Sequence, residues 1–124
     1  MSKSLHLGII NRGLVILKKK EPFLLWLRSL PDPMEEMTLA EANVDPMSLL
    51  IPDFEEAKEA EAFIKERFEK LWGFEMERWW EDNEDWEKNL TWKKFLEWFE
   101  IETSCIVWDL GAGVIERTDD EIVL

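Results

Sequence analysis

The chain has 124 residues, which is enough for one domain and leaves no room for a second with a core of its own. Apolar residues make up 46% of it, with eight Trp and seven Phe, so a shortage of burial area does not prevent folding. The 28 acidic and 15 basic residues give a net charge of -13, which repels phosphate backbones and anionic lipid headgroups. Nucleic acids and membranes are therefore disfavoured as direct partners.

Two residue counts exclude most catalytic and metal-binding signatures. One cysteine, Cys105, cannot form an intramolecular disulfide or a cysteine-rich zinc site, and one histidine, His6, excludes motifs with two imidazoles. Cys105 lies in an apolar stretch that reads as a buried strand, where burial makes a thiol inert. No G-x-S-x-G motif surrounds any serine. We therefore expect no cofactor, no metal and no catalytic residue.

The N-terminal stretch does not read as a signal peptide. Its apolar run is interrupted by Asn11 and Arg12 and ends in three lysines, with no small-residue cleavage site. No window reaches the roughly 18 to 20 apolar residues that span a bilayer. These features predict a cytoplasmic protein.

The first half of the chain predicts two strands with helical segments between them. Leu14–Leu17 is a short aliphatic run typical of a strand buried on both faces, and Lys18–Lys20 read as its solvated end or as a guard against edge pairing. Apolar residues at helical spacing over 23–30, with Pro22 in the first turn, predict a helix. A T-x-x-E capping box at 38–41 begins a helical turn, and Met47–Ile51 predicts the second strand.

The second half predicts two longer helices and a third strand. The first helix follows caps at Asp53 and Glu56 and continues to Trp72, where Gly73 ends or bends it, and residues 74–80 can extend it. After an acidic loop over 81–85, residues 91–99 have the cap and the apolar spacing of another helix. Residues 103–110 predict the third strand, and 114–116 a short fourth one.

These elements predict an α+β or small α/β domain, with a three- to four-stranded sheet packed by three main helices. The crossovers are long enough for parallel pairing of the strands. We expect a loosely ordered N-terminus over 1–12, a single domain over 13–110, and a Gly turn with an acidic tail over 111–124.

Two motifs resemble ligand sites and fail on inspection. The run 107–113 resembles the first nucleotide-binding motif of S-adenosylmethionine-dependent methyltransferases, but only eleven residues follow Gly113 and Glu116 stands where the dinucleotide fingerprint has its third glycine. Glu81, Asn83 and Asp85 alternate like calcium ligands of an EF-hand, but the sixth and twelfth positions are both Trp. The simpler interpretations are a strand that ends in a Gly-rich turn and a solvated acidic loop.

Several segments together resemble a group of small acidic bacterial proteins with no assigned function. The resemblance covers about residues 10 to 110 and rests on 11–17, 30–32, 50–52, the Trp79-Trp80 pair and 92–99. It implies a bacterial cytosolic protein and transfers no catalytic or binding residue.

The segment 53–102 carries a net charge of -9 and six of the eight tryptophans, which favours a non-enzymatic protein-interaction module with an acidic, Trp-bearing face that docks a basic partner. The expected contact residues are Glu75, Trp79, Trp80, Asp82, Asp85 and Trp86. A second hypothesis is a small enzyme or ligand-binding protein whose Trp-lined pocket holds two or more of Glu75, Glu77, Asp82 and Asp85. A third is an acidic mimic of nucleic acid.

Overall fold

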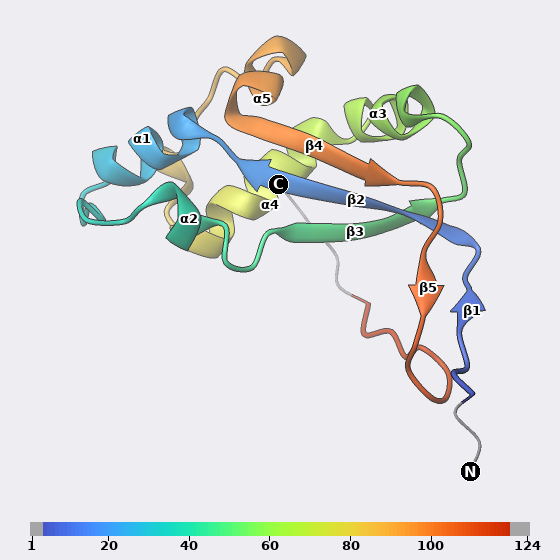
Figure 1. Cartoon of the computed structure of the whole chain (residues 1–124). Helices are drawn as coiled ribbons and strands as arrows, with labels where there is room; N and C mark the ends of the chain where they lie inside the picture. The colour runs from blue at the N-terminus through green and yellow to red at the C-terminus, as the bar shows by residue number, and fades with distance from the viewer. Residues whose placement is uncertain (1–3, 120–124) are drawn as a thin grey trace.

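A computed structural model describes residues 4–119 and shows an α+β domain from which a thin two-stranded arm projects (Figure 1). In chain order the elements are β1 (Gly8–Ile9), β2 (Arg12–Lys19), α1 (Glu21–Ser29), α2 (Leu39–Ala42), β3 (Met47–Pro52), α3 (Ala57–Lys65), α4 (Phe68–Trp79), the 3-10 turn η1 (Asn83–Asp85), α5 (Trp92–Trp98), β4 (Phe99–Ser104) and β5 (Trp108–Asp109).

The main sheet has the strand order β3-β2-β4, and both of its ladders are antiparallel. The expectation of parallel pairing is therefore wrong. The chain leaves β2 through α1 and α2 and re-enters the sheet at the same end, where Met47 lies opposite Leu17. The long connection thus returns without crossing the length of the sheet, so the next strand runs the opposite way.

One face of the sheet forms the core. Along β2 the alternate residues Gly13, Val15, Leu17 and Lys19 are buried, whereas the residues between them are only half-buried, so burial on both faces was the wrong expectation. In Figure 1, α4 crosses behind the sheet. Aromatic rings fill the space between the layers in mostly edge-to-face contacts, for example Trp72 with Trp98 at 5.0 Å between centroids.

Local capping chemistry accounts for most helix starts. The hydroxyls of Thr38 and Thr91 accept hydrogen bonds from the backbone N–H groups of Glu41 and Lys94, as predicted. At α3 the predicted Glu56 is the N-cap and Asp53 is not, and the Glu59 carboxylate accepts the N–H groups of Glu55 and Glu56 at 2.8 and 2.7 Å. The helix predicted to reach Trp72 is two helices, α3 and α4, and Gly73 lies inside the second.

The predicted third strand, 103–110, is also two elements. β4 joins the main sheet, and β5 pairs with β1 in a separate ribbon in which Ile9 lies opposite Trp108 and Gly8 opposite Asp109. We call residues 4–11 and 105–113 the arm. Residues 114–116 are not a strand, which corrects that expectation, and the predicted acidic tail lies outside the described residues beyond Asp119. The proposed domain boundaries remain predictions.

Candidate functional site

Helix α4 carries two different faces. Trp72, Glu75 and Met76 are buried at helical spacing and face the core, as expected for an amphipathic helix. Glu69, Lys70 and Glu77 are exposed on the side that faces the segment 81–90. The helix therefore forms one wall of a surface groove while it anchors the core.

Indole hydrogen bonds fix the other wall of this groove. Trp26 donates to the backbone carbonyl of Asp85 at 2.9 Å, and Trp80 donates to the Asp85 carboxylate at 3.0 Å. Trp86 donates to the Trp80 carbonyl at 2.7 Å, and the Asp82 carboxylate accepts the N–H of Glu84 at the start of η1. Because each bond ties the loop to the helical body or to itself, the wall is held although η1 is the only regular structure between residues 81 and 90.

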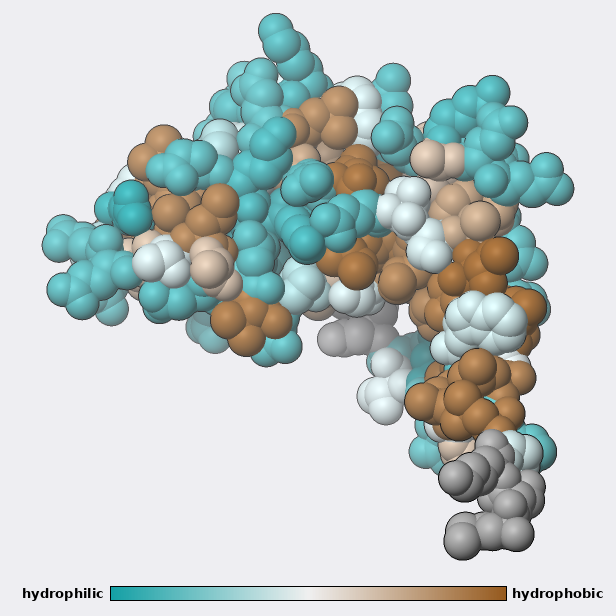
Figure 2. Space-filling model, in the orientation of Figure 1, coloured by the Kyte–Doolittle hydropathy of each residue, from teal (hydrophilic) through white to brown (hydrophobic). Residues whose placement is uncertain are grey.

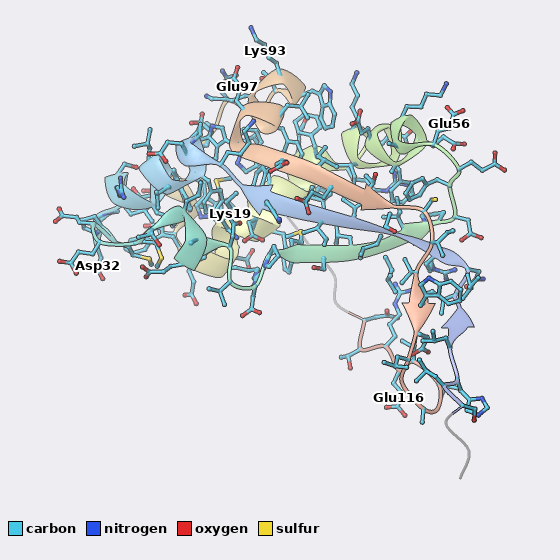
Figure 3. The ribbon with its side chains drawn as sticks, viewed as in Figure 1. Lys19, Asp32, Glu56, Lys93, Glu97 and Glu116 are labelled. Atoms are coloured by element: carbon cyan, nitrogen blue, oxygen red, sulfur yellow. The ribbon has the colours of Figure 1, made fainter. Side chains whose placement is uncertain are left out.

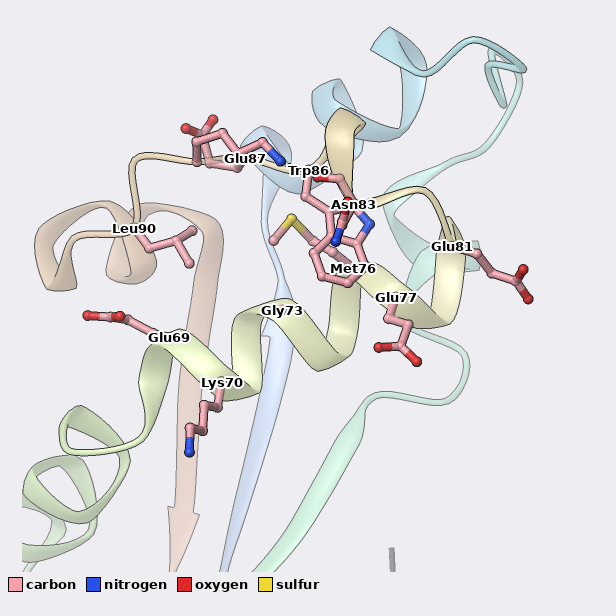
Figure 4. Close-up of a pocket in the computed structure, with 11 residues that line it drawn as sticks. Glu69, Lys70, Gly73, Met76, Glu77, Glu81, Asn83, Trp86, Glu87 and Leu90 are labelled. Atoms are coloured by element: carbon pink, nitrogen blue, oxygen red, sulfur yellow. Dashed lines mark hydrogen bonds between the residues drawn. The ribbon is translucent and has the colours of Figure 1, made fainter. Parts of the chain in front are cut away.

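The groove has a volume of about 740 Å³ (Figure 4). Its lining residues are Glu69, Lys70, Gly73, Met76, Glu77, Glu81, Asn83, Trp86, Glu87, Lys88 and Leu90. Figure 4 shows Glu69 and Glu87 toward one end and Glu77 and Glu81 toward the other. Trp86 lies between these two ends and Leu90 lies beside Glu69 and Glu87, so the groove combines two partly exposed apolar side chains with a predominantly acidic rim.

Four carboxylates and two ammonium groups stand around the groove. Partial burial by itself raises the pKa of Glu87, but hydrogen bonds from the Asn89 backbone N–H and from the Lys94 ammonium outweigh it and hold that pKa below its usual range. Lys88 donates to the Asn83 carbonyl. Glu87 thus keeps its negative charge at neutral pH, and one lysine of the rim is engaged by the backbone.

A buried ion pair lies on the core side of α4. The ammonium group of Lys19 is 2.7 Å from the Glu75 carboxylate, and the two side chains are 1% and 2% exposed. Glu75 also accepts hydrogen bonds from Arg78 at 3.1 Å and from the Trp79 indole at 3.3 Å. Figure 3 shows Lys19 within the body, whereas labelled charges such as Lys93 and Glu97 project from its surface.

This pair corrects the interpretation of Lys18–Lys20 as a solvated strand end. Lys19 occupies the inward position that follows Val15 and Leu17, so strand alternation directs it into the core. β2 is moreover the central strand, so its lysines guard no edge. Of these three lysines, Lys18 and Lys20 have solvent-accessible side chains and Lys19 does not.

The structure divides the six predicted contact residues among different sites. Glu75 and Trp79 belong to the buried ion-pair cluster, while Trp80, Asp82 and Asp85 hold the loop that forms the groove wall. Trp86 alone of the six lines the groove. Of the four carboxylates named for an enzymatic pocket, Glu77 is the one that lines it.

The structure also shows where the other residues considered in the sequence lie. Cys105 is exposed with a free thiol, which corrects the expectation of a buried and inert one, because the chain turns between β4 and β5 at that point. Within residues 4–119 no three His, Cys, Asp or Glu side chains are arranged to hold a metal ion. The Gly111 N–H donates to the Asp109 carboxylate in a turn after β5.

Sequence reasoning missed the groove residues Glu69, Lys70 and Leu90 and the arm. A signal for the arm was present in the alternation of Leu5, Leu7 and Ile9, matched by apolar residues at 106, 108 and 110.

Searches found no family model, no curated protein and no solved structure similar to this chain. The resemblance to small acidic bacterial proteins therefore stays a prediction. No helix among the described residues has the length and apolar character to cross a membrane.

Proposed function

We propose that this protein is a non-enzymatic interaction module whose groove beside α4 takes up a basic segment of a partner protein. The observation that carries the proposal is the acidic rim beside the partly exposed apolar side chains of Trp86 and Leu90. Lysine and arginine have aliphatic stems and cationic ends, so one such side chain satisfies both features of the groove. The stem lies along Trp86, and the cation meets the carboxylates of Glu77 and Glu81.

The same geometry disfavours the two alternative functions. A catalytic pocket built on paired carboxylates needs two of them close together in a desolvated cleft, whereas Glu77 and Glu81 are exposed and Glu75 is neutralised on the core side. A mimic of nucleic acid needs an uninterrupted row of negative charges, and Lys70 and Lys88 interrupt the rim.

Binding of a cationic amphipathic peptide, made of lysine and leucine, tests this proposal. The double variant Glu77→Gln/Glu81→Gln should weaken binding by about tenfold, because rim carboxylates supply most of the attraction. Its matched control is Glu61→Gln/Glu97→Gln, which removes the same charge from exposed positions outside the groove. Binding should also weaken as salt is added.

Equal losses in the two double variants would contradict the proposal, since attraction would then follow net charge and not the groove. Retention of a basic protein from cell extract by the wild-type chain and by the control, but not by the groove variant, would identify a physiological partner.

A further inference from the structure

The arm exposes an apolar face of its own. Ile9 and Trp108 are directly opposite in the ribbon, so their side chains share one face, and they are 63% and 55% exposed. Strand alternation places Leu7 and Leu110 on that same face, and both are exposed as well. Figure 2 shows hydrophobic side chains gathered along the arm below a largely hydrophilic body.

An exposed face of this kind is unusual for a chain that acts alone. Exposed large apolar side chains on the arm include Leu5, Leu7, Ile9, Ile106, Trp108 and Leu110. They are six of the twelve large apolar residues that are exposed in the described part of the chain, and exposed apolar side chains gathered in one place mark interaction sites. A two-stranded ribbon is also only marginally stable in water without a further layer. The arm therefore has the composition of an interface.

The edge strands of the two sheets also differ in how well they are protected against pairing with other strands. The main sheet ends on β3, which is bounded by Pro46 and Pro52, and on β4, which carries Glu100 and Glu102. Proline and charge on edge strands prevent association with other strands. β1 and β5 contain no proline and a single charged residue, Asp109. The arm thus lacks the protection that the main sheet has.

The distribution of charge between arm and body indicates which molecule covers this apolar face. Asp109 is the only acidic or basic residue of the arm apart from His6, although the whole chain has a net charge of -13. A basic partner is attracted to the acidic body and not to a neutral arm. Two copies of this chain repel each other through their bodies, so the arm is where they can approach, and an apolar face complements itself across a two-fold axis.

We propose that two copies of this chain associate through their arms, with the faces centred on Ile9 and Trp108 packed against each other in a symmetric dimer. The acidic bodies then lie at opposite ends, where their repulsion is weakest, and their grooves stay open. This dimer is independent of what the groove binds.

Sedimentation equilibrium of the full chain under reducing conditions tests the dimer, since a reductant prevents Cys105 from linking copies. We expect a monomer–dimer equilibrium for the wild type. Ile9→Ser/Trp108→Ser should raise the dissociation constant by at least about tenfold, because central apolar anchors dominate such interfaces. The control Leu25→Ser/Val44→Ser removes two exposed apolar side chains from the body and should change it little.

Added salt should tighten the dimer, because it screens repulsion between the bodies. A wild type that stays monomeric at high micromolar concentration would overturn the proposal and leave the arm to a different protein. So would equal effects of the two double variants, or open-ended aggregation in place of a dimer. Far-ultraviolet circular dichroism of each variant shows whether the body remains folded.

Discussion

The body and the arm of this molecule use hydrophobic residues in opposite ways. In the body Phe23, Trp72 and Phe95 are fully buried and charged side chains cover the surface. In the arm Ile9 and Trp108 are exposed and charged side chains are nearly absent. Burial in the body supplies the free energy of folding, so apolar residues left outside on the arm are available for association.

Truncation of one aromatic side chain in each region should give the largest difference in the free energy of unfolding. Phe95→Ala should lower the free energy of unfolding by about 3–5 kcal/mol, since it leaves a cavity among the packed rings. Trp108→Ala should change it by less than about 0.5 kcal/mol when measured at a dilution at which the arms do not associate. Urea denaturation measures both variants, and similar losses in the two would contradict the division into body and arm.

The buried ion pair gives a second large effect, confined to the body. Lys19→Met should cost about 3–5 kcal/mol, because Glu75 is left as a buried charge without its ammonium partner. Lys19→Met/Glu75→Met should recover most of that loss, since no buried charge then remains. Urea denaturation of both variants measures the difference. A double variant as unstable as the single one would show that Glu75 is not the group that Lys19 neutralises.

The loop that walls the groove depends on a smaller interaction. Trp80→Phe and Asp85→Ala each remove the indole–carboxylate hydrogen bond, and a double-mutant cycle should give a coupling of about 1 kcal/mol. Either variant should also weaken binding of the cationic peptide, because the wall loses a fixed position. Dimerisation should not change in these variants, and a change there would mean that the two regions are coupled.

Acidification should have the smallest effect on the free energy of unfolding. Hydrogen bonds from the N–H groups of Glu56 and Glu55 hold the pKa of Glu59 below its usual 4.5, and the pKa of Glu87 is also lowered. The unfolded chain therefore binds more protons in this range, so the stabilisation is complete above the unfolded pKa and is lost as pH falls through the folded one.

Urea midpoints between about pH 6 and pH 3 measure this dependence. Glu59→Gln should make the decline toward acid shallower, whereas Glu61→Gln on the same helix serves as the control. An unchanged decline in Glu59→Gln would contradict the role of the cap.

Much of the body follows from the sequence, because local rules decide it. Thr38 and Thr91 cap helices as predicted, and the apolar spacing over 23–30 and 91–99 places α1 and α5. Strand direction did not follow, since a long crossover permits both directions and only the packing of the helices selects one. Lys19 was misread because a charged residue signals solvent unless its partner, here Glu75, is known.

The sequence predicted the acidic and Trp-rich composition of the groove region but not which residues line the groove. A segment rich in carboxylates and tryptophan around 75–86 pointed to the right part of the chain. Which indoles face the groove depends on hydrogen bonds from Trp26 and Trp80 to Asp85, and Trp26 is distant from the loop in sequence. Such contacts leave no periodic pattern in the sequence.

The most direct test of the separation between groove and arm is one set of proton–nitrogen spectra of the indole N–H groups. Titration with the cationic peptide should shift the Trp86 signal and leave the Trp108 signal in place. Dilution of the free protein should shift the Trp108 signal and leave the Trp86 signal in place. If the peptide moves Trp108 or leaves Trp86 unchanged, or if dilution moves Trp86, the two regions do not act separately and the account is contradicted.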